Sequence, residues 1–159
     1  MIKINIIAVS RLKEKYLRDA AAEYQKRLSG FCNLTVTEIE PVKLPEKPSA
    51  SEIASALDKE AEIIIRKIPK SSTVIALCIE GKQLSSEEFA YSLEKETDIG
   101  NSVTFIIGSS YGLSDKIKCL SETKLSFSKM TFPHQLFRIL LLEQIYRAFR
   151  INNGASYHK

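Results

Sequence analysis

Two glycines frame a short polar stretch directly after an apolar run, in the segment FIIGSSYGLS at residues 105–114. Glycine-rich turns after strands bind nucleotide phosphates, but that chemistry requires particular spacings. The P-loop pattern fails because Gly108 and Gly112 are one residue too close and Leu113 stands where a lysine is needed. The dinucleotide pattern fails because it needs three glycines after a first strand. Two interpretations stay open, a ligand loop at a strand end and a plain tight turn.

A second segment, FSKMTF at residues 127–132, precedes Pro133 and His134. It connects a predicted buried strand to a predicted buried helix, so it offers backbone N–H and C=O groups together with apolar side chains. An adenine ring and a thioether-like cofactor bind well to such a mixed surface. An ordinary connection, with Met130 and the two phenylalanines in the core, fits the same residues.

Histidine, the commonest general base, occurs only at positions 134 and 158. His134 begins a predicted helix, where a neutral imidazole can cap or hydrogen-bond, so we expect a structural role for it. His158 lies between Tyr157 and Lys159, near the end of the sequence, where frayed residues are common. The order of residues matches no Ser-His-Asp triad, no glycosidase carboxylate pair and no H-E-x-x-H motif. Hydrolase chemistry and a metal site are therefore not supported.

Three arginines recur along the last predicted helix, Arg138, Arg147 and Arg150, and Lys129 comes just before it. Arg147 and Arg150 share a face, whereas Arg138 lies about 180° from Arg147 on an ideal helix. The three arginines therefore do not form one stripe. They fit either a solvated fringe or guanidinium contacts with phosphates or a reacting base.

The composition is that of one soluble globular domain over residues 1–159, with 44% hydrophobic and 26% charged residues. The net charge is +4, but residues 115–159 contain eight Lys or Arg and only three Asp or Glu. This local excess indicates a surface that faces a polyanion such as nucleic acid. No apolar stretch approaches the roughly 20 residues of a membrane span, and the first residues are charged too early for a signal peptide. We therefore expect a cytoplasmic protein.

Strands and helices are predicted to alternate along the whole chain. The predicted strands cover residues 2–9, 34–39, 73–79, 103–108 and 124–127, and the predicted helices cover residues 13–28, 49–67, 85–95, 114–120 and 133–151. Such alternation predicts an α/β layered fold with a mostly parallel sheet. The last helix is apolar on more than one face, so we expect a second subunit to cover it in a homodimer.

Several segments of the chain also match those of a known family. They are SRLKEKYLRDAAAEYQKRL, IALCIEGKQLSSEEFA, FIIGSSYGLS, LSFSKMTFPHQLFRILLLEQIYRAF and the closing YHK. Together they closely resemble the RlmH family of SPOUT-class methyltransferases, which act on a pseudouridine of large-subunit 23S ribosomal RNA. The resemblance covers essentially the whole chain, and residues 125–159 are its most specific part.

This resemblance implies a SPOUT-type fold with a carboxyl-terminal trefoil knot, a homodimer, and S-adenosylmethionine held by the knot loops. The cofactor-contacting positions of the family fall on Leu77, Gly108, Phe127, Ser128, Lys129, Met130, Thr131 and Phe132. The family commonly has a second glycine directly after Gly108, where this chain has Ser109.

The activity that the resemblance implies is methyl transfer to N3 of a pseudouridine on the assembled ribosome. That reaction requires removal of the imide proton. The catalytic positions are then His158 as the candidate base, presented across the dimer interface, Arg138 steadying the imidate or its phosphate, and Tyr157, ordered with His158 around the substrate. The alternative is a catalytically inactive module of the same fold that binds RNA or the ribosome.

Overall fold

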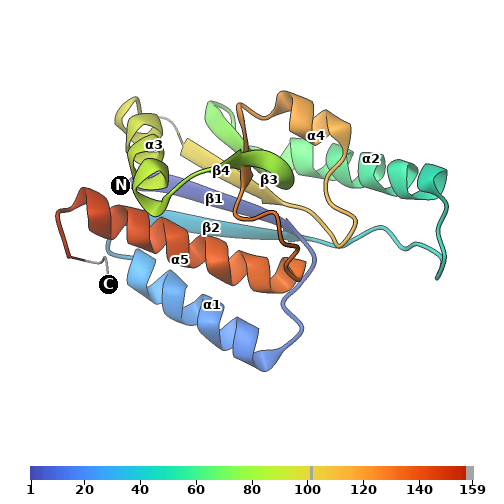
Figure 1. Cartoon of the computed structure of the whole chain (residues 1–159), viewed down its shortest axis with the longest axis horizontal. Coiled ribbons are helices and arrows are strands. Elements are labelled where there is room, and N and C mark those ends of the chain that lie inside the picture. The colour runs from blue at the N-terminus through green and yellow to red at the C-terminus, as the bar shows by residue number, and fades with distance from the viewer. Residues whose placement is uncertain (101, 157–159) are drawn as a thin grey trace.

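The computed structural model describes residues 1–100 and 102–156, which form a parallel sheet with helices on both faces (Figure 1). The sheet has five strands in the order β2-β1-β4-β3-β5, and each neighbouring pair is parallel. The strand bounds are β1 Ile2–Val9, β2 Cys32–Ile39, β3 Ser72–Gln83, β4 Ser102–Ile107 and β5 Thr123–Ser126. The predicted α/β layered fold is therefore confirmed.

The helices of the described chain connect these strands. Their bounds are α1 Lys15–Leu28, α2 Ala50–Lys67, α3 Ser86–Asp98, α4 Asp115–Leu120 and α5 His134–Asn152. Figure 1 shows α1, α3 and α5 on one face of the sheet and α2 and α4 on the other. Every predicted helix is present. None of the helices within residues 1–100 and 102–156 is both long and apolar enough to cross a membrane.

Two helices begin with capping boxes, in which a serine and a glutamate three residues later exchange hydrogen bonds. The Ser49 hydroxyl accepts a hydrogen bond from the Glu52 N–H at 3.1 Å, and the Glu52 carboxylate accepts one from the Ser49 N–H at 3.1 Å. Ser85 and Glu88 exchange the same pair of bonds at the start of α3, at 3.1 Å and 2.7 Å. Each box satisfies two N–H groups that the first helical turn leaves without a partner, so the starts of α2 and α3 are fixed locally.

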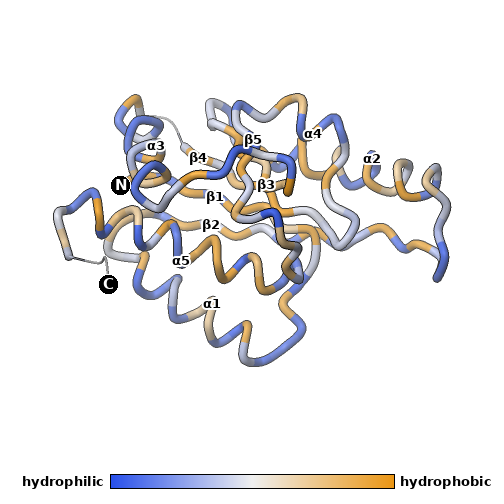
Figure 2. The backbone as a smooth tube through the Cα atoms, viewed as in Figure 1, coloured by the Kyte–Doolittle hydropathy of each residue, from blue (hydrophilic) through white to orange (hydrophobic). Residues whose placement is uncertain are grey.

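Two apolar cores lie on opposite faces of the sheet. Phe105 and Ile106 are neighbours on β4, both fully buried, and they belong to different cores because side chains alternate along a strand. Phe105 packs in the core under α1, α3 and α5, and Ile106 packs in the core under α2 and α4. Figure 2 shows the central strands as mainly hydrophobic segments between mixed helices. A strand buried on both faces explains the continuous apolar run that precedes Gly108.

The strand β3 differs from its prediction over residues 73–79, because pairing with β5 resumes farther along the chain. Leu77 pairs with Leu125, and after a break in register Lys82 pairs with the same residue. Residues 78–81 therefore bulge out of the sheet. Glycine and charged residues in this segment favour a strand end by sequence pattern alone, and the pairing with β5 overrides that pattern.

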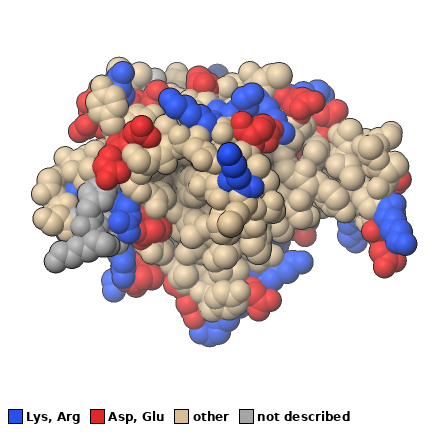
Figure 3. Space-filling view, in the orientation of Figure 1, with Lys and Arg blue, Asp and Glu red and all other residues tan. Residues whose placement is uncertain are grey.

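The helix α5 is covered inside the chain by α1 and α3, which pack along it. Its apolar surface is nevertheless not fully covered, since Leu136 is 37% exposed. Met130 and Phe132, just before the helix, are also exposed. Figure 3 shows a wide uncharged area over α5 and the segment that precedes it, with charged side chains at its borders. An exposed apolar area of this kind suits an interface.

Gly81 is required where β3 returns to β5, which predicts a specific loss of stability. A Cβ atom at this position would lie 2.7 Å from the carbonyl carbons of Lys124 and Leu125, so the backbone would have to shift. We expect Gly81→Ala to lower the free energy of unfolding by about 1–3 kcal/mol, as overpacking does. Gly30→Ala is the matched control, because a Cβ there meets open space, and its effect should stay within about 0.5 kcal/mol. Urea unfolding followed by circular dichroism measures both, and equal midpoints would contradict the role of Gly81.

Candidate functional site

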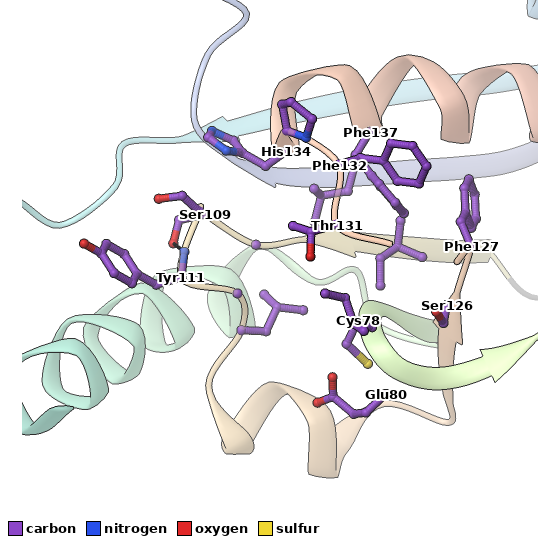
Figure 4. Close-up of a pocket in the computed structure, with 18 of the residues that line it drawn as sticks. Cys78, Glu80, Ser109, Tyr111, Ser126, Phe127, Thr131, Phe132, His134 and Phe137 are labelled. Carbon is purple, nitrogen blue, oxygen red and sulfur yellow. Dashed lines mark hydrogen bonds between the residues drawn. The ribbon is translucent and has the colours of Figure 1, made fainter. Parts of the chain in front are cut away.

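A cavity of about 630 Å³ lies at the carboxyl ends of β3, β4 and β5 (Figure 4). Its walls come mainly from residues 77–80, 107–113 and 126–134. Parallel sheets bind ligands at this edge because the backbone groups there are not used by the strand ladder. Of the two interpretations of FIIGSSYGLS, its position in this wall favours the ligand loop.

The first wall is the bulge of β3. The Glu80 carboxylate accepts from the Lys118 ammonium group at 2.5 Å, which ties the bulge to α4. This hydrogen bond from Lys118 lowers the pKa of Glu80 and raises the pKa of Lys118. Cys78 also lines the cavity, and burial raises the pKa of its thiol, with a smaller contribution from Glu80. Cys78 is therefore a neutral, weakly polar lining group near pH 7.

The second wall is the turn that follows β4. The Gly112 N–H donates to the Ser109 carbonyl at 2.9 Å, and the Tyr111 N–H donates to the Ser109 hydroxyl at 3.3 Å. Gly112 has a φ of +87°, which favours glycine. Gly108 is required for a different reason, because a Cβ there would overlap the carbonyl oxygen of Gly112. Ser109 has no positive φ, so its backbone conformation accepts a side chain.

The third wall is the chain between β5 and α5. The Ser126 hydroxyl donates to the Ser128 carbonyl at 3.0 Å, and the Met130 N–H donates to the Ser128 hydroxyl at 3.0 Å. The ring of Phe127 lies 4.7 Å from that of Phe137, centroid to centroid, and joins this segment to α5. Met130 is 75% exposed, so it is not the core residue of an ordinary connection. The segment therefore presents apolar side chains to the cavity on a backbone held by its own serines.

His134 lines the same cavity at the first position of α5. Burial lowers the pKa of this histidine, and the positive charges of Arg138 and Lys13 lower it further. The imidazole is consequently neutral near pH 7. The sequence analysis predicted a structural role for His134, and its position in the cavity wall adds a possible contact with a ligand. The start of a helix directly after the lining segment is the signal that could have identified it.

Arg138 lies one turn farther along α5, and its guanidinium is only 4% exposed. One terminal nitrogen donates to the Glu38 carboxylate at 2.7 Å, and the other donates to the Ser10 carbonyl at 2.7 Å. Its Nε is buried without a partner among the described residues. Arg138 is not a lining residue of the cavity. It joins α5 to the ends of β1 and β2, beside His134.

The structure brings most of the predicted cofactor positions together. Those that line the cavity are Leu77, Gly108, Phe127, Ser128, Met130, Thr131 and Phe132. Lys129 belongs to the same segment but does not line it. Tyr157 and His158 lie outside the described residues. The other lining residues with polar or aromatic groups, which the sequence did not predict as site residues, are Cys78, Glu80, Ser110, Tyr111, Lys118, Ser126 and Phe137.

Metal ligation is not a feature of the described part of the chain. Within residues 1–100 and 102–156, no group of three or more His, Cys, Asp or Glu side chains could hold a metal ion. The cavity offers instead backbone groups, three phenylalanines and small hydroxyl side chains, a surface suited to an organic ligand.

Known proteins resemble this chain in fold and in sequence. A solved structure described as "a probable methylase family protein from Haemophilus influenzae Rd KW20" superposes with a TM-score of 0.56 at 17% identity, over 100% of this chain and 72% of that one. This likeness concerns the fold alone. Proteins named "Ribosomal RNA large subunit methyltransferase H" from Bacillus thuringiensis (strain Al Hakam) and Bacillus cereus (strain B4264) are each 52% identical over 159 residues, covering 99% of this chain and 100% of the relative.

A sequence model of one family also matches nearly the whole chain. That family is described as "Predicted SPOUT methyltransferase", and the match covers residues 2–158. It includes each of the three cavity walls, and the full-length relatives agree with it. The chain therefore belongs to the SPOUT methyltransferase family.

Proposed function

We propose that this protein transfers a methyl group from S-adenosylmethionine to N3 of a pseudouridine in 23S ribosomal RNA of the assembled ribosome, in the cytoplasm. The observation that carries the proposal is a cavity at the carboxyl edge of the sheet in a chain that matches ribosomal RNA methyltransferases over its full length. The excess of basic residues in residues 115–159 adds support, because the substrate is a polyanion.

The cavity fits S-adenosylmethionine in size and chemistry. Its volume of about 630 Å³ lies within the usual range for small-molecule sites, roughly 300–1,000 Å³. The residues proposed to hold the cofactor are Leu77, Gly108, Phe127, Ser128, Lys129, Met130, Thr131 and Phe132. In this proposal Phe127, Met130 and Phe132 contact the apolar parts of the ligand, while the backbone beyond Gly108 and around Ser128 hydrogen-bonds its polar parts.

In the proposed reaction, the cavity residues bind the cofactor, and residues 157–159, called the tail here, act on the substrate. When bound, S-adenosylmethionine supplies an electrophilic methyl group on a sulfonium, which departs as a neutral thioether. The target nitrogen becomes nucleophilic only when its N–H proton is removed, and His158 is the proposed acceptor of that proton. Tyr157 is proposed to orient the base beside it. Arg138 was expected to steady the imidate or its phosphate. We propose a positioning role for it instead, because its terminal nitrogens already hold Glu38 and Ser10.

A trefoil knot and a homodimer complete the proposal. The support for a knot is the family match together with the pairing of β5 with β3 on both sides of the bulge, next to which the chain continues toward α5. The exposed Met130, Phe132 and Leu136 form an apolar area that a second copy would cover. A dimer would also let the tail of one protomer reach the cavity of the other.

The direct test is the methylation state of ribosomal RNA in cells. Deleting the gene should remove the N3-methyl group from the pseudouridine, as measured by mass spectrometry of digested RNA, and the wild-type gene should restore it. A gene lacking residues 157–159 should not restore it, although the truncated protein binds S-adenosylmethionine normally. A methylated pseudouridine in the deletion strain would reject the proposed function. Full restoration by the truncated gene would reject only the role of the tail.

Cofactor binding should depend on Gly108 and not on a second glycine. We expect Gly108→Ala to weaken the affinity for S-adenosylmethionine about tenfold or more, roughly 1.4 kcal/mol, because the new methyl group displaces the turn. Ser109→Gly is the comparison variant. It removes the hydroxyl that holds the Tyr111 N–H but adds no atom to the turn, so it should weaken affinity less than Gly108→Ala does. Isothermal titration calorimetry measures both. A folded wild-type protein that binds no cofactor would favour the inactive RNA-binding module instead.

The protonation of His134 should affect a cationic ligand selectively. Since the pKa of His134 is lowered, the imidazole is neutral above about pH 6.5 and gains its charge only below that value. The affinity for S-adenosylmethionine should then fall as the pH drops below about 6.5, because two positive charges would share the cavity. S-adenosylhomocysteine, which lacks the sulfonium charge, should show a smaller fall. In His134→Gln the two ligands should respond to pH alike, and equal responses in the wild type would contradict this role.

A further inference from the structure

Tyr111 is a large aromatic side chain that the fold leaves exposed at the edge of the cavity. It lines the cavity and is 46% exposed. Figure 4 shows Tyr111 and Ser109 at the end of the cavity opposite Phe127. Among the described aromatic residues, none has its ring in contact with that of Tyr111. The core does not use this ring, so its exposed face is available to a ligand.

The turn that carries Tyr111 is rigid. Its N–H is held by the Ser109 hydroxyl at 3.3 Å, and the turn is closed by the Gly112 N–H on the Ser109 carbonyl at 2.9 Å. The turn also folds back tightly on Gly108, where no Cβ fits. A tyrosine on such a backbone has only its side-chain torsions to lose on binding, so the entropic cost of a contact is small.

Exposed lysines lie near the same end of the cavity. Figure 4 shows His134 on the side of Ser109 and Tyr111. The exposed Lys13 acts electrostatically on this neutral imidazole. Lys116, in the first turn of α4, is exposed shortly after the turn. Cations beside an exposed aromatic ring are the combination with which proteins bind single-stranded nucleic acid.

We propose that Tyr111 is a stacking platform for an unpaired RNA base next to the nucleotide that is methylated. This inference rests on the proposed function. The target base must leave its stack to enter the cavity, and its neighbour then loses a stacking partner. The ring of Tyr111 replaces that partner at the cavity entrance. Stacking on an aromatic ring tolerates any base, because every base has a π-face, so Tyr111 contributes affinity and placement rather than sequence recognition.

The adenine of the cofactor is the other planar ring that could lie on Tyr111. The apolar side chains Leu77, Phe127 and Phe137 line the cavity away from the turn and provide a more enclosed surface for adenine. An effect of Tyr111 on cofactor affinity therefore separates the two possibilities.

The experiment compares Tyr111→Ala, Tyr111→Phe and Tyr16→Ala. Tyr16 is 69% exposed on α1 and is not a lining residue, so it controls for loss of an exposed tyrosine. Methyl transfer is measured on ribosomes from a strain lacking the enzyme, and binding of a fluorescent single-stranded oligoribonucleotide is measured by anisotropy. We expect Tyr111→Ala to raise KM for ribosomes and Kd for the oligonucleotide about 5- to 100-fold, the range of one lost stack. Tyr111→Phe and Tyr16→Ala should stay near wild type.

The possible outcomes distinguish this proposal from the proposed function. If wild-type protein methylates ribosomes and Tyr111→Ala leaves both measurements unchanged, the stacking platform is rejected alone. If Tyr111→Ala weakens S-adenosylmethionine binding in calorimetry to the same extent, the ring serves the cofactor and the proposal is also rejected. If wild-type protein transfers no methyl group but Tyr111→Ala still weakens oligonucleotide binding, stacking is supported and the proposed function fails. Wild-type protein that binds no RNA overturns both.

Discussion

The candidate site depends on one backbone constraint, which is the double pairing of β5 with β3. The backbone of Leu125 is the partner of Leu77 before the bulge and of Lys82 after it. The four residues between them must then leave the sheet, and they leave it at the carboxyl edge, where Cys78, Ile79 and Glu80 line the cavity. Gly81 packs against the backbone of β5 without space for a Cβ. The bulge therefore requires a glycine at this position and is fixed at these residues. The position of the first wall is therefore set by hydrogen bonds and sterics rather than by apolar packing.

The second wall repeats the same principle at β4. Gly108 is in contact with the Gly112 carbonyl, so the turn folds onto the strand from which it emerged. In both walls, therefore, one backbone segment contacts another at a glycine. Such a contact cannot relax by rotating a side chain. A site built in this way is already arranged before any ligand arrives, which reduces the cost of binding. The third wall is less constrained, since its serines hold it locally and Met130 extends into solvent.

Local patterns predicted the elements of this fold well because local physics determines them. The capping boxes of Ser49 and Ser85 fix two helix starts, and the continuous apolar run before Gly108 reflects a strand buried on both faces. Pairing between segments that are distant in the sequence could not be predicted from such local patterns. The extension of β3 past residue 79 depends on β5, which lies about forty residues later in the sequence. The contact that requires glycine at position 108 was also not predicted, because it comes from the Gly112 carbonyl and not from a positive φ. Tyr111 lies within one of the two segments that the sequence singled out and His134 lies just after the other, but the individual importance of each arises from the cavity that it lines.

The distribution of charge around the cavity favours a cationic ligand over a nucleotide phosphate. Lys118 is paired with Glu80, and the guanidinium of Arg138 is held by Glu38 and the Ser10 carbonyl. His134 is kept neutral by burial and by the same Arg138. A phosphate site would need cations directed at the ligand, as the P-loop lysine is. Here each of these basic groups is either paired or deprotonated, while the Glu80 carboxylate stays charged at the rim because the Lys118 hydrogen bond lowers its pKa. In the proposed reaction, a sulfonium would enter such a cavity without meeting an uncompensated positive charge, and the proposed polyanionic substrate would be bound by basic groups outside it.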